Sequence, residues 1–316
     1  MTSQRTVMIA LGGNALSPKS EAGTIAQQFS HTKKSLKCVM HFVRAGYNIC
    51  ITHGNGPQVG AELSRNEIAS EKIPPLPLGV LVANTQGAMG YMIQQSLQNS
   101  LYSEDSEREV VSFISQMKVD QNDPKFGHST KFIGQSFAKD KAQKYMDEYA
   151  WQMKEQEPGI WRRLVPSPSP LYIFNGKSIK HLVDFGTIVI AGGGGGIPAY
   201  NLEDGTLEGL DGVIDKDMTA ALLGRIIKAQ ELFIITDVDN IYLNFKTESQ
   251  EIIRETTARN IETWLNEGHF WRGSMEPKIK AALYFLKHHG KEVIITSIDN
   301  IKQAIQKQAG TRILGN

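Results

Sequence analysis

Cysteine is scarce in this sequence, and long hydrophobic runs are absent. Only Cys38 and Cys50 occur among 316 residues, with no CxxC pattern, which argues against a disulfide scaffold and against a zinc site. Two isolated thiols favour a reducing compartment, so we expect a cytoplasmic protein. No apolar run approaches the roughly 20 residues that span a bilayer, and no basic-then-apolar signal segment opens the chain. We therefore expect no membrane partner.

The sequence also lacks an excess of charge of either sign. Its 34 Lys and Arg residues and 33 Asp and Glu residues give a formal net charge of +1, so the global charge does not favour a nucleic-acid partner. The hydrophobic fraction of 41% and the charged fraction of 21% are ordinary for a globular protein. The length suits one large α/β domain, with or without an inserted piece.

Short apolar runs alternate with segments of helical periodicity along most of the chain. Such runs are typical of strands that are buried on both faces of a parallel sheet. Strands are expected at residues 6–11, 48–52, 109–114, 187–191, 231–236, 292–296 and 311–314. Helices are expected at residues 24–44, 78–101, 217–227, 257–266 and 276–290, with a short one after Asp299. This alternation predicts an α/β protein with a mainly parallel sheet covered by helices on both faces.

Residues 118–178 interrupt the alternation with many charged and aromatic side chains. They also contain Pro124, Pro158, Pro166, Pro168 and Pro170. We expect part of this segment to form an inserted subdomain that lies over a cleft, within a single domain of residues 1–316.

Glycine-rich turns follow three of the predicted strands. The turns are Gly12-Gly13-Asn14, Gly54-Asn55-Gly56 and the run from Gly192 to Gly196. Glycine lets backbone N–H groups approach a ligand, and a helix start behind the turn adds partial positive charge. Three such turns at one sheet edge indicate a multiply charged anionic substrate, although tight turning alone also uses glycine. The first turn lacks the G-x-G-x-x-G spacing of dinucleotide-binding proteins, and no G-x-x-x-x-G-K-[ST] loop occurs.

Asp215, Lys216 and Asp217 stand where an apolar run passes into a helix. The ordinary interpretation is a helix start, with Asp217 or Asp215 as the cap. A lysine held between two carboxylates at a strand end also suits a site for anions. The short motif alone favours the first interpretation.

Six motifs in order resemble those of carbamate kinase, a branch of the amino acid kinase superfamily. They are Ala10-Leu-Gly-Gly-Asn-Ala-Leu16, Thr52-His-Gly-Asn-Gly-Pro-Gln-Val-Gly60, Trp161-Arg-Arg-Leu-Val-Pro-Ser-Pro168, Gly193-Gly-Gly-Gly-Ile-Pro198, Val213-Ile-Asp-Lys-Asp217 and Gly273-Ser-Met-Glu-Pro-Lys278. The resemblance implies a three-layer α/β/α sandwich with an inserted lid, a homodimer, and reversible phosphoryl transfer between ATP and carbamate. It further implies ATP or ADP with Mg²⁺, and flux toward ATP from carbamoyl phosphate in arginine catabolism.

The chemistry calls for positive charge more than for a general base. A carbamate oxygen is already anionic, so the obstacle to its reaction is repulsion between anions. By resemblance, Lys216 and Lys278 lie near the nucleotide phosphates, and Lys131 reaches the transferred group from the lid. Asp215 is expected to orient these ammonium groups.

The resemblance also assigns the residues that bind the two substrates. Carbamate and the phosphoryl group are expected at Gly12, Gly13, Asn14, Gly54 and Asn55. The nucleotide is expected at Lys216, Thr236, Asp237, Asp239, Tyr242, Gly273, Ser274, Met275 and Lys278. For Asp237 and Asp239, turn formation is an equally good interpretation. No protein metal ligand is expected, because the phosphates hold Mg²⁺. His53 is expected to shape its loop, and the other histidines have no metal-ligand spacing.

The lid motif departs from the family pattern. The family has Asn-Pro-Thr-Lys-Pro-Ile-Gly, whereas this chain has His128-Ser-Thr-Lys-Phe-Ile-Gly134, which keeps the lysine and lacks both prolines. Before Trp161, Glu157-Pro-Gly-Ile160 replaces the usual Asp-Ala-Gly-Arg-Gly. Two rival hypotheses follow: a paralogue that acts on another small carboxylate or carbamoyl compound, and a nucleotide-binding regulatory protein with little turnover.

Overall fold

The main body is built on an eight-stranded sheet, seen in a computed structural model that describes residues 4–16, 23–126, 128–271 and 274–315. The strand order is β15-β17-β16-β12-β1-β2-β9-β3. The strands are β1 (Thr6–Leu11), β2 (Asn48–His53), β3 (Val110–Ser112), β9 (Ile188–Ile190), β12 (Glu231–Thr236), β15 (Glu255–Thr257), β16 (Glu292–Ser297) and β17 (Thr311–Leu314). Neighbours are parallel except β16 and β17. The predicted α/β class and mainly parallel sheet are confirmed.

Strand register brings three chain turns to the same edge of the sheet. Leu11, the last residue of β1, pairs with His53 of β2 and with Ile235 of β12. All six residues of β1 are buried, as expected for a central strand with helices on both faces. The loops after β1, β2 and β12 therefore meet beyond the carboxyl ends of the strands, where ligands bind in such folds.

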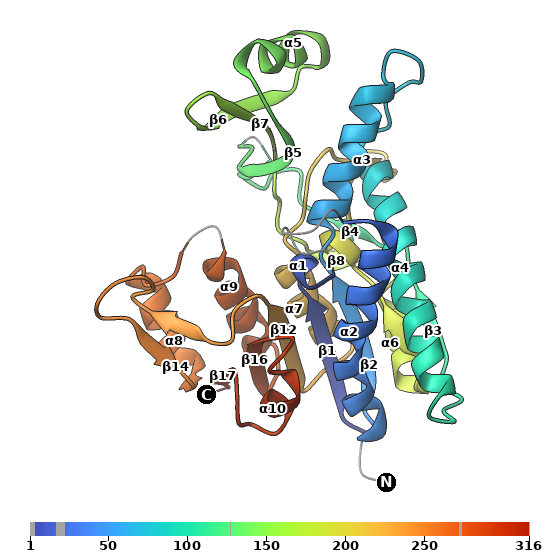
Figure 1. Cartoon of the computed structure of the whole chain (residues 1–316), viewed down its shortest axis with the longest axis vertical. Coiled ribbons are helices and arrows are strands. Elements are labelled where there is room, and N and C mark those ends of the chain that lie inside the picture. Colours follow the sequence, from blue (N-terminus) through green and yellow to red (C-terminus); the bar gives the residue numbers. More distant parts are fainter. Residues whose placement is uncertain (1–3, 17–22, 127, 272–273, 316) are drawn as a thin grey trace.

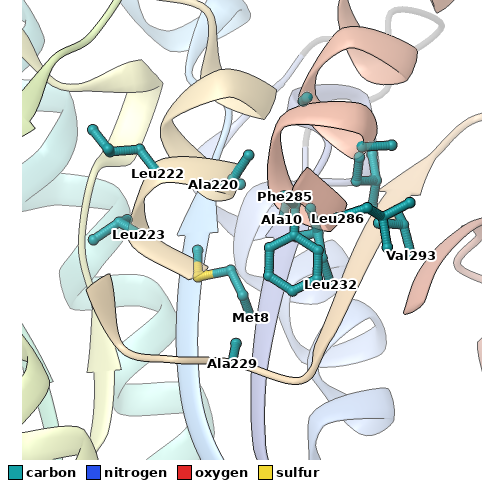
Figure 2. Close-up of a cluster of buried hydrophobic side chains, with 14 of the residues drawn as sticks. Met8, Ala10, Ala220, Leu222, Leu223, Ala229, Leu232, Phe285, Leu286 and Val293 are labelled. Atoms are coloured by element: carbon teal, nitrogen blue, oxygen red, sulfur yellow. The ribbon is translucent and has the colours of Figure 1, made fainter. Parts of the chain in front are cut away.

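Two hydrophobic cores, one on each face of the sheet, give three layers. Helices α2 (Ile25–Arg44), α4 (Leu78–Tyr102) and α10 (Ile301–Ile305) cover one face. Helices α6 (Gly176–Phe185), α7 (Lys216–Ile226), α8 (Ala258–Asn266) and α9 (Met275–Lys287) cover the other. Figure 2 shows Met8 and Ala10 of β1 beside Leu223 of α7 and Phe285 of α9. The predicted three-layer α/β/α sandwich is confirmed. Among the described residues, no helix is long and apolar enough to cross a membrane.

A separate small sheet stands at the top of the molecule in Figure 1. Strands β5 (Lys131–Phe137), β7 (Ile160–Val165) and β6 (Gln152–Glu157) are antiparallel, and α5 (Lys139–Tyr149) packs on them. Phe137, Tyr145 and Ala142 form the small core of this unit, with Trp151 and Trp161 at its border. We call residues 131–165 the insert; it lies inside the segment 118–178.

The chain on either side of the insert belongs to the main body. Strands β4 (Gln116–Lys118) and β8 (Tyr172–Ile173) join β10 (Ile197–Asn201) and β11 (Leu207–Gly209) in a four-stranded sheet. A hairpin of β13 (Ile241–Leu243) and β14 (Glu251–Ile253) follows β12. Strand β3 is shorter than the predicted run 109–114.

Candidate active site

A cavity of about 540 Å³ lies at the carboxyl ends of β1, β2 and β12. Its walls come from α1 (Gly13–Leu16), the start of α3 (Gly56–Ala69), the starts of α7 and α9, and the loop after β12. The predicted site residues that line it are Gly12, Gly13, Gly54, Asn55, Lys131, Asp215, Lys216, Thr236, Asp237, Tyr242, Ser274, Met275 and Lys278. Asp239 is not among the lining residues. The side chain of Asn14 and all of Gly273 lie outside the described residues.

Two lysines share one buried carboxylate in this cavity. Lys216 Nζ lies 3.0 Å from Asp217 Oδ1, and Lys278 Nζ lies 3.0 Å from Asp217 Oδ2. Lys216 begins α7 and Lys278 lies in the first turn of α9; these two helices pack against each other. The Asp217 side chain is only 5% exposed, so its charge is compensated by the two ammonium groups and very little by water.

Burial and charge pairing act in opposite directions on the pKa values of these groups. Burial raises the pKa of Asp217, but the positive charges of Lys216 and Lys278 outweigh it and the pKa is lowered. Burial lowers the pKa of Lys216, and the attraction of Asp217 only partly opposes it. Burial also lowers the pKa of Lys278, but the attraction of Asp217 outweighs burial, and the pKa of Lys278 is raised. The carboxylate therefore stays ionised, and Lys278 keeps its proton at neutral pH.

Asp215 and Asp217 have separate roles: the cap is Asp215, one of the two expected candidates, whereas the carboxylate that contacts Lys216 and Lys278 is Asp217 and not the expected Asp215. Asp215 is the helix cap: its Oδ1 accepts hydrogen bonds from the amides of Asp217 at 2.9 Å and Met218 at 3.3 Å. The carboxylate that fixes Lys216 and Lys278 is Asp217. The physical reason is that a cap residue has extended backbone and turns its side chain back over the first helical amides. Asp215 still orients one ammonium group, because Lys131 Nζ lies 3.7 Å from its Oδ2.

The glycines of the first two turns allow close approach of the backbone. A Cβ at Gly12 would lie 2.9 Å from the carbonyl oxygen of Ile235, and one at Gly54 would lie 2.8 Å from the nitrogen of Gly13. The amide of Gly12 donates to Ile235 and that of Gly54 to Leu11. These two amides are therefore engaged within the protein, and the expected backbone cradle has to come from the residues that follow them.

The five-glycine run contributes Gly194 to the wall of the cavity. The run contains η1 (Gly193–Gly195), in which Gly194 has a φ of +66°, and a Cβ at Gly194 would lie 2.3 Å from Nδ2 of Asn55. Asn55 in turn donates from Nδ2 to Thr85 Oγ1 at 2.9 Å. His53 is buried against Gly193, and burial lowers the pKa of His53 to about 4. A neutral His53 that supports its loop agrees with the sequence interpretation.

Three aromatic residues, Tyr242, Phe245 and Trp271, form a wall of the cavity that sequence analysis does not predict as a whole. Phe245 lies between Tyr242 and Trp271, with ring centroids 5.7 Å and 6.2 Å apart. His269 also lines the cavity, and its Nδ1 lies 2.8 Å from Asn244 Oδ1. Of these residues only Tyr242 is predicted, from the family resemblance, because the hairpin of β13 and β14 and the loop of His269 and Trp271 have no periodic signal.

Comparison with known proteins identifies the family of the chain. The model of the amino acid kinase family matches residues 5–297. Carbamate kinase of Pyrococcus furiosus is 39% identical over 98% of this chain and 99% of its own, and that of Trichomonas vaginalis is 39% identical with the same coverage. The solved carbamate kinase from Giardia lamblia bound to AMP-PNP is 36% identical, covers both chains fully and has a TM-score of 0.94. The chain belongs to the carbamate kinase branch of the amino acid kinase family. The predicted family is therefore confirmed.

The lid motif that departs from the carbamate kinase pattern is held by backbone pairing and stacking. Lys131 opens β5 and pairs with Val165 of β7, and the amide of Thr130 donates to Val165 at 3.2 Å. Phe132, which replaces a proline, lies 5.8 Å from the guanidinium of Arg162. These contacts hold residues 130–132, where the second proline of the family pattern is lacking.

The carboxylates of the cavity suit a cation that arrives with phosphates. Asp217 is bound by two lysines, and Asp215 by helix amides and Lys131. Asp237 is exposed and accepts a hydrogen bond from Thr236 Oγ1 at 3.0 Å. Within the described part of the chain, no group of three or more His, Cys, Asp and Glu residues is arranged to hold a metal ion. This donor set fits Mg²⁺, which commonly binds through substrate phosphates and one or two carboxylates.

Proposed function

We propose that the protein is an ATP:carbamate phosphotransferase, which transfers a phosphoryl group reversibly between ATP and carbamate. The observation that carries the proposal is the buried arrangement of Lys216, Asp217 and Lys278, with Lys131 opposite at Asp215. Two carboxylates and three ammonium groups leave a local excess of positive charge. Such an excess stabilises the charge that spreads over a phosphoryl group in transfer.

In the direction of ATP synthesis, an oxygen of the β-phosphate of ADP attacks the phosphorus of carbamoyl phosphate. The bond between that phosphorus and the carbamate oxygen breaks, and carbamate leaves as an anion with the bonding electrons. No proton needs to move, so Lys131, Lys216 and Lys278 act by position and charge. When bound to the nucleotide phosphates, Mg²⁺ supplies further charge neutralisation.

The carbamate end is proposed at the turns after β1 and β2. Gly13, Asn55 and Gly56 line the cavity at the starts of α1 and α3. The side chain of Asn55 does not cap α3, and the 14-residue helix presents partial positive charge at this end. An anionic carbamoyl phosphate suits this position.

The nucleotide end is proposed at Thr236, Asp237, Tyr242, Ser274, Met275 and Lys278. The aromatic wall of Tyr242, Phe245 and Trp271 suits stacking of a purine base. Asp239 is left out of the proposal because it does not line the cavity.

The remaining expectations of the family are part of the same proposal. They are a homodimer, a place in the cytoplasm, and flux toward ATP in arginine catabolism. Both cysteines are free and buried, which agrees with a reducing compartment.

The test is formation of ATP from MgADP and an acyl phosphate. With purified protein, carbamoyl phosphate should give ATP, and acetyl phosphate at equal concentration should give at least 10-fold less. Faster ATP formation from acetyl phosphate would favour the paralogue. Binding of ADP with no ATP from either donor would contradict the proposal and favour a regulatory protein.

A further inference from the structure

Asp211 joins three elements through one carboxylate. Its Oδ2 lies 2.9 Å from Nη2 of Arg163 on β7 of the insert. Its Oδ1 accepts a hydrogen bond of 3.0 Å from the backbone amide of Leu78, the first residue of α4. The preceding Pro77 offers no side-chain cap to that helix. Asp211 itself stands four residues before Asp215 on the segment that leads to α7.

Arg163 anchors the insert end of this contact. Its side chain is 11% exposed and lies 4.3 Å from the ring centroid of Trp151. Burial lowers the pKa of Arg163, and the charge of Asp211 opposes that shift. The guanidinium is thus held by packing and by its hydrogen-bonded ion pair with Asp211, and the charge of Glu67 on α3 also favours its ionised form. Other contacts also tie the insert to the main body: Gln135 of β5 donates to Glu67 of α3 at 2.6 Å, and Ile133 and Val165 pack in a buried hydrophobic cluster with residues of α3 and α4.

The segment after Asp211 is held between the insert and the glycine run. The amide of Val213 donates to the carbonyl oxygen of Pro166 at 3.0 Å, directly after β7. Ile214 is buried, with its carbonyl against Gly195. Asp215 then caps α7 and faces Lys131 at 3.7 Å. Lys131 pairs in the small sheet with Val165, two residues from Arg163.

These contacts connect the ion pair of Asp211 and Arg163 to the position of Lys131. A rotation of the insert about its two connections to the main body would move Lys131 relative to Asp215. The contact of Arg163 with Asp211 opposes such a rotation, because it joins β7 to the segment that carries Asp215. A displacement of about 1 Å at a reacting group costs up to about 100-fold in rate.

We propose that Asp211 is a positioning residue, which holds the insert so that Lys131 faces the transferred phosphoryl group beside Asp215. The proposal rests on the proposed function. It adds a residue outside the cavity that acts through Lys131.

Asp211→Asn separates this role from capping. The amide side chain keeps an oxygen for the Leu78 amide, and it removes both the charge and the acceptor oxygen that meet Arg163. We expect kcat for ATP formation to fall about 10-fold, while KM for ADP stays within 2-fold because, apart from Lys216 on α7, the residues expected to bind the nucleotide lie after β12 and at the start of α9. Asp184→Asn is the matched control: its side chain is 50% exposed against 49% for Asp211, and it pairs with Lys180 on α6. This control should leave kcat unchanged.

A double-variant cycle tests whether Asp211 acts through Lys131. In a Lys131→Ala background, Asp211→Asn should lower kcat by less than 2-fold, because the group that it positions is gone. An equal loss in both backgrounds would overturn the proposal, and so would a rise in KM for ADP that matches the fall in kcat.

Amide hydrogen exchange gives a readout that does not depend on turnover. In Asp211→Asn, exchange should become at least 10-fold faster in residues 131–137 and 213–219 and should be unchanged in β1 and β2. Unchanged exchange throughout would overturn the positioning role, even where the wild type makes ATP. Faster exchange in a protein whose wild type makes no ATP would support the contact and contradict the proposed function.

Discussion

Asp217 sets the charge balance at the centre of the site. As a single buried carboxylate between Lys216 and Lys278, it keeps two ammonium groups close to each other that would otherwise repel. With Lys131 and Asp215 included, the five groups carry a formal excess of one positive charge. Substrates that bring several negative charges meet this excess beside a carboxylate whose side chain is only 5% exposed.

The variant Asp217→Asn should lose both stability and activity. Removing one partner from a buried ion pair costs about 3 kcal/mol in the free energy of unfolding, and kcat should fall about 100-fold. Because the pKa of Asp217 in the folded protein is lowered to about 2, its contribution is present above the unfolded value near about 4 and is lost as pH falls. Urea unfolding should therefore show a larger difference between wild type and variant at pH 7 than at pH 3. An equal difference at both pH values would contradict the buried ion pair.

The sequence is enough to select Lys216 as a site residue, but it does not show which of the two neighbouring carboxylates contacts the lysines. A lysine in this motif is recognisable from the family resemblance and from the need for positive charge. The roles of Asp215 and Asp217 depend on which backbone position begins α7, and that position is decided by tertiary contacts that no local pattern contains. Phe245 and Trp271 could not be predicted for a similar reason, because they come together only in the folded chain.

Among the elements, the glycine-rich turn η1 contributes to the shape of the site. η1 lies next to Asn55. The positive φ of Gly194 costs a residue with a side chain about 1–2 kcal/mol. A side chain at this position would also push against the Asn55 amide. The turn therefore sets the height of the β2–α3 loop in the cavity.

Gly194→Ala should raise KM for carbamoyl phosphate at least 10-fold and lower Tm. Gly205→Ala is the matched control, because Gly205 has a φ of +84° and open space around its Cα. Both variants should lose stability from backbone strain, but only Gly194→Ala should affect KM. Equal KM values in steady-state assays of the two variants would show that crowding of Asn55 has no role in substrate binding.

Periodicity accounts for the elements that could be predicted. Long buried strands such as β1 and β12 and the capped helix α2 carry strong local signals, and they occur where expected. The hairpin of β13 and β14 has three residues in each strand, too few for a period to be read. Charged and proline-rich composition covers both the insert and its flanks, so it could not show that the folded unit is residues 131–165.

At the scale of the whole molecule, α4 presents an exposed stripe on the outer surface. Val80, Tyr91 and Tyr102 are spaced 11 residues apart, which returns to nearly the same helix face, and they are 43%, 59% and 85% exposed. Gly87 lies within this stripe, and a Cβ there would meet nothing within 4 Å. A stripe with a small residue at its middle permits close approach of a second helix, which agrees with the proposed homodimer.

Gly87→Gln tests the stripe as an interface. Sedimentation should give the wild type twice the chain mass of 35.0 kDa. The variant should dissociate at least 10-fold more readily, while its monomer gains about 0.5 kcal/mol from better helix propensity. Gly209→Gln, at a similarly open glycine of β11, is the control and should remain dimeric. A wild-type monomer, or a Gly87→Gln dimer of unchanged affinity, would refute this interface.

The central claim is that placed lysines carry the phosphoryl transfer, and α9 offers a direct test. Lys278 contacts Asp217, whereas Lys280, two residues further on, pairs with Glu276 on the surface. The measurement is the initial rate of ATP formation from MgADP and carbamoyl phosphate, in the wild type and in Lys216→Ala, Lys278→Ala and Lys280→Ala. The account predicts losses of at least about 100-fold for the first two variants and less than 2-fold for Lys280→Ala. Near-normal rates in folded Lys216→Ala or Lys278→Ala would contradict it.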